Sequence, residues 1–143
     1  MRLQLALNVD DIDEAVDFYN RLFATEPAKR RPGYANYAIA EPPLKLVLFE
    51  KPGDGGSLNH LGVEAETVPE VMEARERLER SGLDTTGVDE TSCCYAYKTE
   101  TWVTDPDGAR WEWYVKTGNS EQLENVIVAS GQVGDDSGGA CCA

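Results

Sequence analysis

Basic residues are scarce in this chain. Its 143 residues include 13 lysines and arginines against 26 aspartates and glutamates, which gives a formal net charge of −13. Nucleic acids and anionic membrane surfaces bind clustered lysine and arginine, so the charge argues against both as partners. No apolar run is long enough for a membrane span. Acids at Asp10 and Asp11 interrupt the N-terminus early, so we expect no secretory signal there.

Spaced cysteines are missing as well. The four cysteines form two adjacent pairs, Cys93 with Cys94 and Cys141 with Cys142. Disulfide frameworks use spaced cysteines, so free thiols in a reducing cytoplasm are the better interpretation. Two neighbouring thiolates can bind one soft metal or metalloid, whereas a disulfide between adjacent residues needs a strained ring. The alternative is that one cysteine is a small buried hydrophobe and neither has a chemical role.

The first part of the chain predicts a strand, a helix and further strands. Apolar residues alternate at 3–9, as in a half-buried strand, and then recur at helical spacing over 12–23. Two apolar runs at 34–40 and 44–50, joined at Pro42-Pro43, favour an antiparallel hairpin. Residues 51–57 are a linker by composition.

The same order then starts again. A strand is predicted at 60–65, a helix from 68 to about 82, a short strand near 85–88, and strands at 97–104 and 110–116 around a turn at 105–108. The two stretches align without a gap from Gln4 against His60 to Leu22 against Leu78. We therefore predict an α+β protein of two modules, each with a strand, a helix and about three strands.

The predicted modules span about 2–51 and 58–116 and form one domain, 1–116. Residues 117–143 are rich in Gly, Asp and Ser, so we expect a flexible C-terminal tail. The apolar patch at 126–128 leaves room for a short helix or strand around 123–128.

A second group of candidate residues begins with His60, the only histidine in the chain. His60 and Gln4 open the first strands of their modules, and their apolar neighbours should pack on the helices, which turns both side chains to the opposite, concave face. Glu112 alternates with Trp111 and Trp113 and faces away from them. An imidazole, an amide oxygen and a carboxylate would suit a divalent first-row metal. The alternatives are an ordinary histidine and a solvated glutamate.

Two further side chains belong to the same predicted faces. Asn8 shares the face of Gln4, and Tyr114 shares that of Glu112. Both are candidate pocket residues, and a solvated amide and a strand-end aromatic are equally good interpretations. The stretch around Cys93 and Cys94 lies between strands and is expected to be a mobile loop.

Several segments resemble the vicinal oxygen chelate superfamily, which includes glyoxalase I, extradiol dioxygenases and bleomycin resistance proteins. They are QLALNV at 4–9, LNHLGVE at 58–64, and TDPDG at 104–108 followed by Trp111 and Glu112. The resemblance covers about residues 2–116. It implies two paired βαβββ modules that form a cleft in a concave mixed sheet, with metal ligands at Gln4, His60 and Glu112.

Within that superfamily, PGYANY at 32–37, PPLKLVL at 42–48 and TSCCY at 91–95 resemble the bacterial C–As lyases and the related cadmium-induced proteins. This implies an Fe(II)-dependent dioxygenase that uses dioxygen to cleave the carbon–arsenic bond of methyl or aromatic trivalent organoarsenicals and releases arsenite. Cys93 and Cys94 would hold arsenic. Cys141 and Cys142 would be auxiliary thiols, or an incidental end of the tail.

Two other functions remain open at this point. One is a cadmium- or arsenite-binding resistance protein without turnover, which would use the same thiols. The other is a glyoxalase-like enzyme with a different metal. The sequence is also compatible with a cleft built from one chain or shared in a homodimer.

Overall fold

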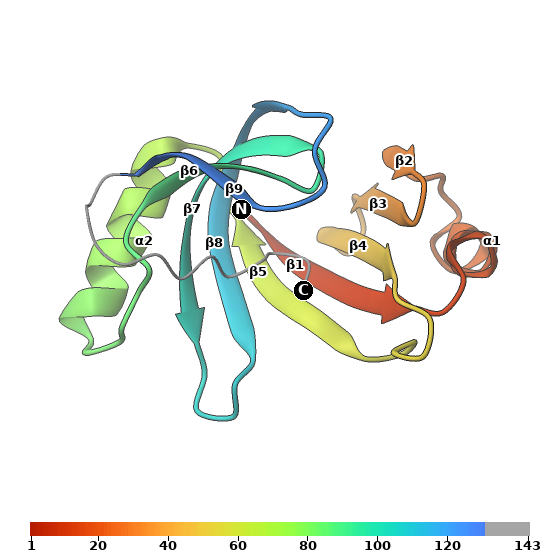
Figure 1. The fold of residues 1–143 in the computed structure, drawn as a ribbon, viewed down its shortest axis with the longest axis horizontal. Coiled ribbons are helices and arrows are strands. Elements are labelled where there is room, and N and C mark those ends of the chain that lie inside the picture. The colour runs from red at the N-terminus through yellow and green to blue at the C-terminus, as the bar shows by residue number, and fades with distance from the viewer. Residues whose placement is uncertain (131–143) are drawn as a thin grey trace. The chain divides into compact units, whose positions relative to one another are not determined.

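The computed structural model describes residues 1–130, and their elements repeat one order (Figure 1). A strand, a helix and three strands occur twice along the chain, and one further strand follows. The predicted α+β fold with two βαβββ modules is therefore confirmed. The chain divides into two compact halves, residues 2–61 and the part from residue 62 onward together with Met1.

The first half contains β1 (Arg2–Val9), α1 (Ile12–Phe23), β2 (Lys29–Arg31), β3 (Tyr34–Ile39), β4 (Leu44–Glu50) and the start of β5 (Leu58–Glu64). Its strands lie in the order β2-β3-β4-β1-β5. β3 and β4 form the predicted antiparallel hairpin, and β1 pairs with β4 in parallel, with Leu5 opposite Leu46.

Helix α1 covers one face of these strands. It begins at Asp11, whose side chain accepts hydrogen bonds from the main-chain nitrogens of Asp13 and Glu14, as an N-cap should. The apolar side of the helix and the alternate residues of β1 form one core with the hairpin. Its buried members are Ile12, Val16, Ala35, Tyr37, Ile39, Leu46 and Leu48, with Leu5, Leu7 and Val9 packed against them. Residues 4, 6 and 8 therefore point to the other face, as predicted.

The second half contains α2 (Val68–Arg80), β6 (Asp89–Cys93), β7 (Ala96–Thr104), β8 (Arg110–Asn119) and β9 (Val126–Ser130). Its strands lie in the order β8-β7-β6-β9 and all three pairings are antiparallel. Thr67 and Glu70 form a capping box at the start of α2. Val71 of the helix packs with Val115 of β8, and Arg77 lies over the ring of Trp113. The tryptophan face of β8 is thus the helix face, which leaves Glu112 and Tyr114 on the opposite one.

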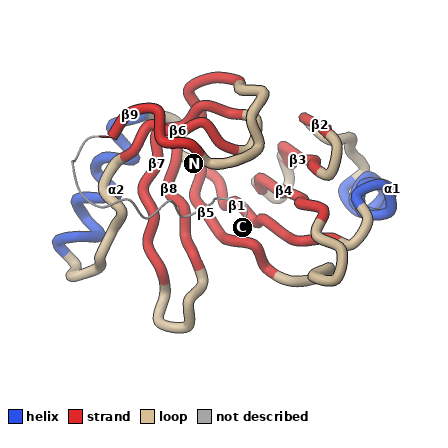
Figure 2. The backbone as a smooth tube through the Cα atoms, viewed as in Figure 1, coloured by secondary structure: helices blue, strands red, loops and turns tan. Residues whose placement is uncertain are grey.

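The structure differs from the sequence predictions in two places. Residues 85–88 are not a strand, and the strand that follows α2 is β6, at 89–93. Part of the predicted tail is regular, because β8 extends to Asn119 and β9 pairs with β6. The loop at 105–109 links β7 to β8 where a turn was predicted (Figure 2). None of the helices among residues 1–130 is long and apolar enough to cross a membrane.

Candidate active site

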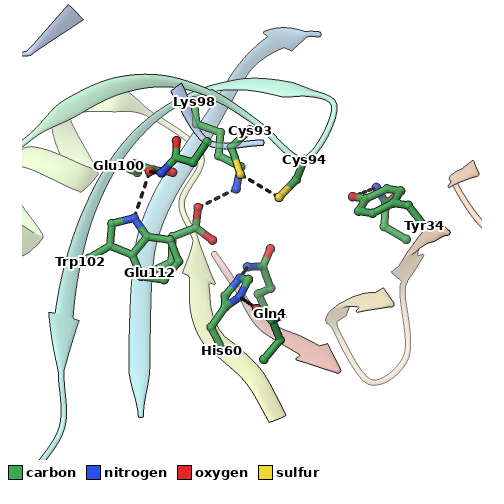
Figure 3. A network of polar contacts seen from close by, with 12 residues as sticks. Gln4, Tyr34, His60, Cys93, Cys94, Lys98, Glu100, Trp102 and Glu112 are labelled. Atoms are coloured by element: carbon green, nitrogen blue, oxygen red, sulfur yellow. Dashed lines mark hydrogen bonds and ion pairs between the residues drawn. The ribbon is translucent and has the colours of Figure 1, made fainter. Parts of the chain in front are cut away.

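The structure brings His60 and Gln4 together within the first half. His60 lies on β5 and Gln4 on β1, and their side chains are 2% and 3% exposed. The Nε2 atoms of the two side chains are 3.0 Å apart (Figure 3). The ring of Phe49 lies beside the imidazole, with 6.3 Å between the ring centroids. The two residues that open their modules are therefore direct neighbours.

Three polar side chains are linked by hydrogen bonds to the other ring nitrogen of His60. Its Nδ1 lies 2.7 Å from Oδ1 of Asn59, and Nδ2 of Asn59 donates to Oδ1 of Asn8 at 2.9 Å. Asn8 in turn donates from Nδ2 to Oγ of Ser57 at 2.9 Å. Asn8 is thus part of a hydrogen-bonded chain behind His60. Sequence reasoning missed Asn59 and Ser57, although Asn59 directly precedes the only histidine.

Glu112 lies in the second half and is paired with a buried lysine. Glu112 is 0% exposed and Lys98 6% exposed, and Nζ of Lys98 is 2.6 Å from Oε1 of Glu112 (Figure 3). The same ammonium group lies 4.5 Å from the ring centroid of Tyr114, in cation–π geometry. Burying a carboxylate is costly unless it is paired, so Lys98 explains how Glu112 is tolerated there. Tyr114, a candidate pocket residue, contacts Lys98.

A second buried carboxyl, Glu100, stands beside this ion pair. It accepts a hydrogen bond from Nε1 of Trp102 at 3.0 Å and is hydrogen-bonded to Glu112. Burial first, and then the negative charge of Glu112, raise the pKa of Glu100 to about 8, against the opposing effect of Lys98. The raised pKa favours the neutral form of the Glu100 carboxyl. No sequence motif marked Glu100, because an acid in a strand is unremarkable until its burial and neighbours are known.

Cys93 and Cys94 lie at the hairpin turn between β6 and β7. Cys93 is the last residue of β6 and pairs with Ala96, the first residue of β7. Cys94 and Tyr95 form the turn, with φ angles of 56° and 60°. Two positive φ values are typical of type I′ hairpin turns, where Asn and Gly are usual. Neither cysteine forms a disulfide, and their sulfur atoms are 2.8 Å apart (Figure 3).

Main-chain hydrogen bonds hold this turn to the segment after β8. The nitrogens of Cys94 and Tyr95 donate to the carbonyl oxygens of Leu123 and Gln122 at 2.9 and 2.8 Å. The nitrogen of Ser120 donates back to the carbonyl of Tyr95 at 3.1 Å. The predicted loop is thus a tight turn in this structure, with its polar main-chain groups bonded.

Strand register places Cys93, Lys98 and Glu112 on one face of the strands β6, β7 and β8. Residues opposite one another in a ladder share a face, and alternate residues of a strand share a face. Cys93 pairs with Ala96, two residues before Lys98, and Glu112 pairs with Trp102, four residues after it. One thiol of the pair and the candidate carboxylate ligand therefore face the same way, opposite to α2.

Within residues 1–130, no three His, Cys, Asp or Glu side chains are grouped as a metal site. The predicted set contains only two such residues, because its third member is the amide of Gln4. An imidazole nitrogen, an amide oxygen and a carboxylate are donor types that suit a divalent first-row metal. The imidazole and the amide are neighbours in one half, and a buried carboxylate is present in the other. The second cysteine pair, Cys141 and Cys142, lies outside the described residues.

Comparison with known proteins adds independent findings. The family model described as Glyoxalase/Bleomycin resistance protein/Dioxygenase superfamily matches residues 3–113. The chain is 57% identical over 120 residues to the cadmium-induced protein CadI of Mycobacterium tuberculosis, covering 84% of this chain and 79% of that protein. It is 51% identical over 142 residues to a trivalent organoarsenical cleaving enzyme of Thermomonospora curvata, covering 99% of this chain and 87% of that enzyme.

The fold also has relatives among solved structures. The Mn(II)-bound glyoxalase from Novosphingobium aromaticivorans superimposes with a TM-score of 0.57 at 17% identity, over 84% of this chain and 40% of that one. At this identity the match concerns the fold alone.

Proposed function

Because the chain belongs to the glyoxalase/bleomycin resistance protein/dioxygenase superfamily, we propose that it is an Fe(II)-dependent dioxygenase that cleaves the carbon–arsenic bond of trivalent organoarsenicals. The observation that carries the proposal is a pair of neighbouring thiols that form no disulfide. Their sulfur atoms are 2.8 Å apart, on a turn whose Cys93 shares a sheet face with Glu112. The 51% identity to an enzyme named for organoarsenical cleavage supports the same function.

The thiols would bind the substrate by exchange. A trivalent arsenical with one organic group carries two hydroxyls on arsenic. Cys93 and Cys94 would replace them, forming two arsenic–sulfur bonds and releasing two molecules of water. Arsenic is then held at two points, and the organic group stays attached and fixed in direction, as positioning for catalysis requires. The exchange needs reduced thiols, so the proposed function belongs to a reducing compartment such as the cytoplasm.

Gln4, His60 and Glu112 would hold the metal. His60 offers the Nε2 lone pair, Gln4 its carboxamide oxygen and Glu112 its carboxylate, a mixed nitrogen and oxygen set that suits a divalent first-row metal. When bound there, Fe(II) would supply the activation of dioxygen, the oxidant of the reaction. Lys98 and Glu100 would fix the orientation of Glu112, and Asn59 that of His60.

The experiment is a turnover assay with a matched thiol control. The protein is loaded with Fe(II) without oxygen, given trivalent methyl- or phenylarsenic and then exposed to air, and inorganic arsenite is separated and counted. We expect several turnovers, and almost none for Cys93→Ser or His60→Ala. The Cys141→Ser/Cys142→Ser variant removes the other thiol pair and should keep the activity. Absence of arsenite with the native protein would refute the proposal.

Thiol-dependent sequestration of a soft metal is the second candidate, because the chain is 57% identical to a protein named as cadmium-induced. Here Cys93 and Cys94 would bind cadmium or arsenite stoichiometrically, and neither oxygen nor Glu112 would matter. Arsenite release by the native protein and by Glu112→Gln separates the two functions. Under sequestration neither protein releases arsenite and both bind cadmium equally, whereas under the dioxygenase proposal the native protein releases arsenite and Glu112→Gln does not.

A further inference from the structure

The hydrogen bonds around His60 form a chain whose direction is fixed at one end. That end is the main-chain carbonyl of Asp54, which can only accept. The hydroxyl of Ser57 lies 2.7 Å from it and donates its hydrogen there. The oxygen of Ser57 is therefore the acceptor for Asn8, whose Nδ2 lies 2.9 Å away.

The direction of these hydrogen bonds also determines which nitrogen of the imidazole carries the hydrogen. With Nδ2 of Asn8 turned to Ser57, its Oδ1 accepts from Nδ2 of Asn59. Asn59 must then present its own oxygen to Nδ1 of His60, at 2.7 Å. Because an amide oxygen only accepts, the hydrogen of this contact belongs to Nδ1 of the ring.

The contact on the other side of the ring agrees with this assignment. Nε2 of His60 lies 3.0 Å from the amide nitrogen of Gln4, which only donates. Nε2 must therefore carry the lone pair. Both ring nitrogens thus point to one tautomer, with the hydrogen on Nδ1.

We propose that Asn59, Asn8 and Ser57 form a relay that sets His60 in the Nδ1–H tautomer and so presents the Nε2 lone pair as a ligand. Asn59 is a positioning residue, and the segment at 54–57, a linker by composition, supplies the fixed end of the relay. The role toward a metal depends on the proposed function, but the tautomer itself does not. Removing a hydrogen-bond partner behind a histidine ligand usually weakens metal binding 10- to 100-fold.

The single histidine makes the tautomer directly measurable. In protein labelled with ¹⁵N-histidine, the imidazole of His60 gives the only pair of ring nitrogen signals. In metal-free protein, at an alkaline pH where the ring-nitrogen shifts no longer change with pH, we expect a protonated-type shift for Nδ1 and a lone-pair-type shift for Nε2. An Nε2–H tautomer in the native protein would overturn the proposal.

Three variants test the relay. Asn59→Leu keeps the shape but removes the acceptor, so both shifts should move toward a mixture of tautomers and the Kd for Co(II) should rise 10- to 100-fold. Asn59→Asp keeps an acceptor and should retain the native shifts. Ser57→Ala removes the fixed end and should give an intermediate result. Unchanged shifts in both Asn59→Leu and Ser57→Ala would overturn the relay.

A control variant at another asparagine tests whether the effects are specific to Asn59. Asn119→Leu makes the same change at an exposed position of β8 and should leave shifts and Kd unaltered. If Asn59→Leu does not fold, the native, Asn59→Asp and Ser57→Ala spectra still decide the matter. The spectra need neither iron nor arsenic. A native-like tautomer without arsenite release would refute the proposed function alone.

Discussion

Glu100 should make the metal-free protein lose stability as the pH rises. The residue is 1% exposed and lies against Glu112. Burial, together with the negative charge of Glu112, raises the pKa of Glu100 from 4.5 to about 8. Between these two values the folded protein keeps a proton that the unfolded chain has lost. The unfolded state then binds fewer protons, so the free energy of unfolding falls with rising pH across this window and is level above it.

The size of the effect follows from the shift. One pKa unit corresponds to about 1.4 kcal/mol, so the displacement of Glu100 corresponds to at most roughly 5 kcal/mol above pH 8. Glu100→Gln removes this dependence, because an amide stays neutral. It can still accept from Nε1 of Trp102 and donate to Glu112. We expect the variant to match the native protein near pH 5 and to exceed its stability by a few kcal/mol near pH 9.

Urea denaturation with a metal chelator present, at about pH 5, 7 and 9, measures this difference. Glu90→Gln makes the same change at an exposed position of β6 and should show little pH-dependent difference from the native protein. A stability difference between Glu100→Gln and native protein that is the same at pH 5 and 9 would refute the account of the buried carboxyl pair. So would a Glu100→Gln variant that is less stable at pH 9.

Three further predictions concern stability. Lys98→Met leaves Glu112 buried without its cation and should lower the free energy of unfolding, measured with urea, by about 3 kcal/mol at pH 7. The loss should be smaller at pH 5, where the carboxyl can take up a proton. The control Lys116→Met, at an exposed position, should change the free energy of unfolding by under about 0.5 kcal/mol. Gly108→Ala should lower the free energy of unfolding, obtained from thermal unfolding, by about 1–2 kcal/mol, because the φ angle of Gly108 is +91° and strains a residue with a side chain. The new methyl group meets no atom within 4 Å, so an unchanged stability would contradict the strain argument. Thr67→Ala should lose about 1 kcal/mol of cap energy, and Thr67→Ser should restore it.

Local periodicity was sufficient to predict much of this fold. The alternation of β1 and the apolar spacing of α1 are properties of neighbouring residues, and so is the alternation of Trp113 and Val115 with Glu112. These patterns predicted the order of elements in each module, the face of β1 on which Gln4 lies and the face of β8 on which Glu112 lies. In the structure, the side chains of Gln4 and His60 lie within hydrogen-bond distance of each other.

The remaining features depend on contacts between distant segments. Residues 126–130 are a strand because β6 offers them a partner, and their own sequence predicts only a short apolar patch. From their sequence, Lys98 and Glu100 resemble the polar residues of an exposed strand. In the structure, the register of β7 with β8 places both beside Glu112. The tautomer relay also depends on such contacts, since Asn8 near the end of β1 is hydrogen-bonded to Ser57, which directly precedes β5.

The conformation of the turn that carries Cys93 and Cys94 depends on the segment after β8. Cys94 and Tyr95 both have positive φ, which costs a residue with a side chain roughly 1–2 kcal/mol each compared with glycine. Such strain persists only where surrounding contacts determine the conformation. Here those contacts are the main-chain hydrogen bonds to Gln122 and Leu123, together with the bond between the hydroxyls of Ser92 and Ser120 at 2.6 Å. The position of the sulfur atoms is therefore set by residues 120–123, which carry no recognisable motif, as well as by the cysteines themselves.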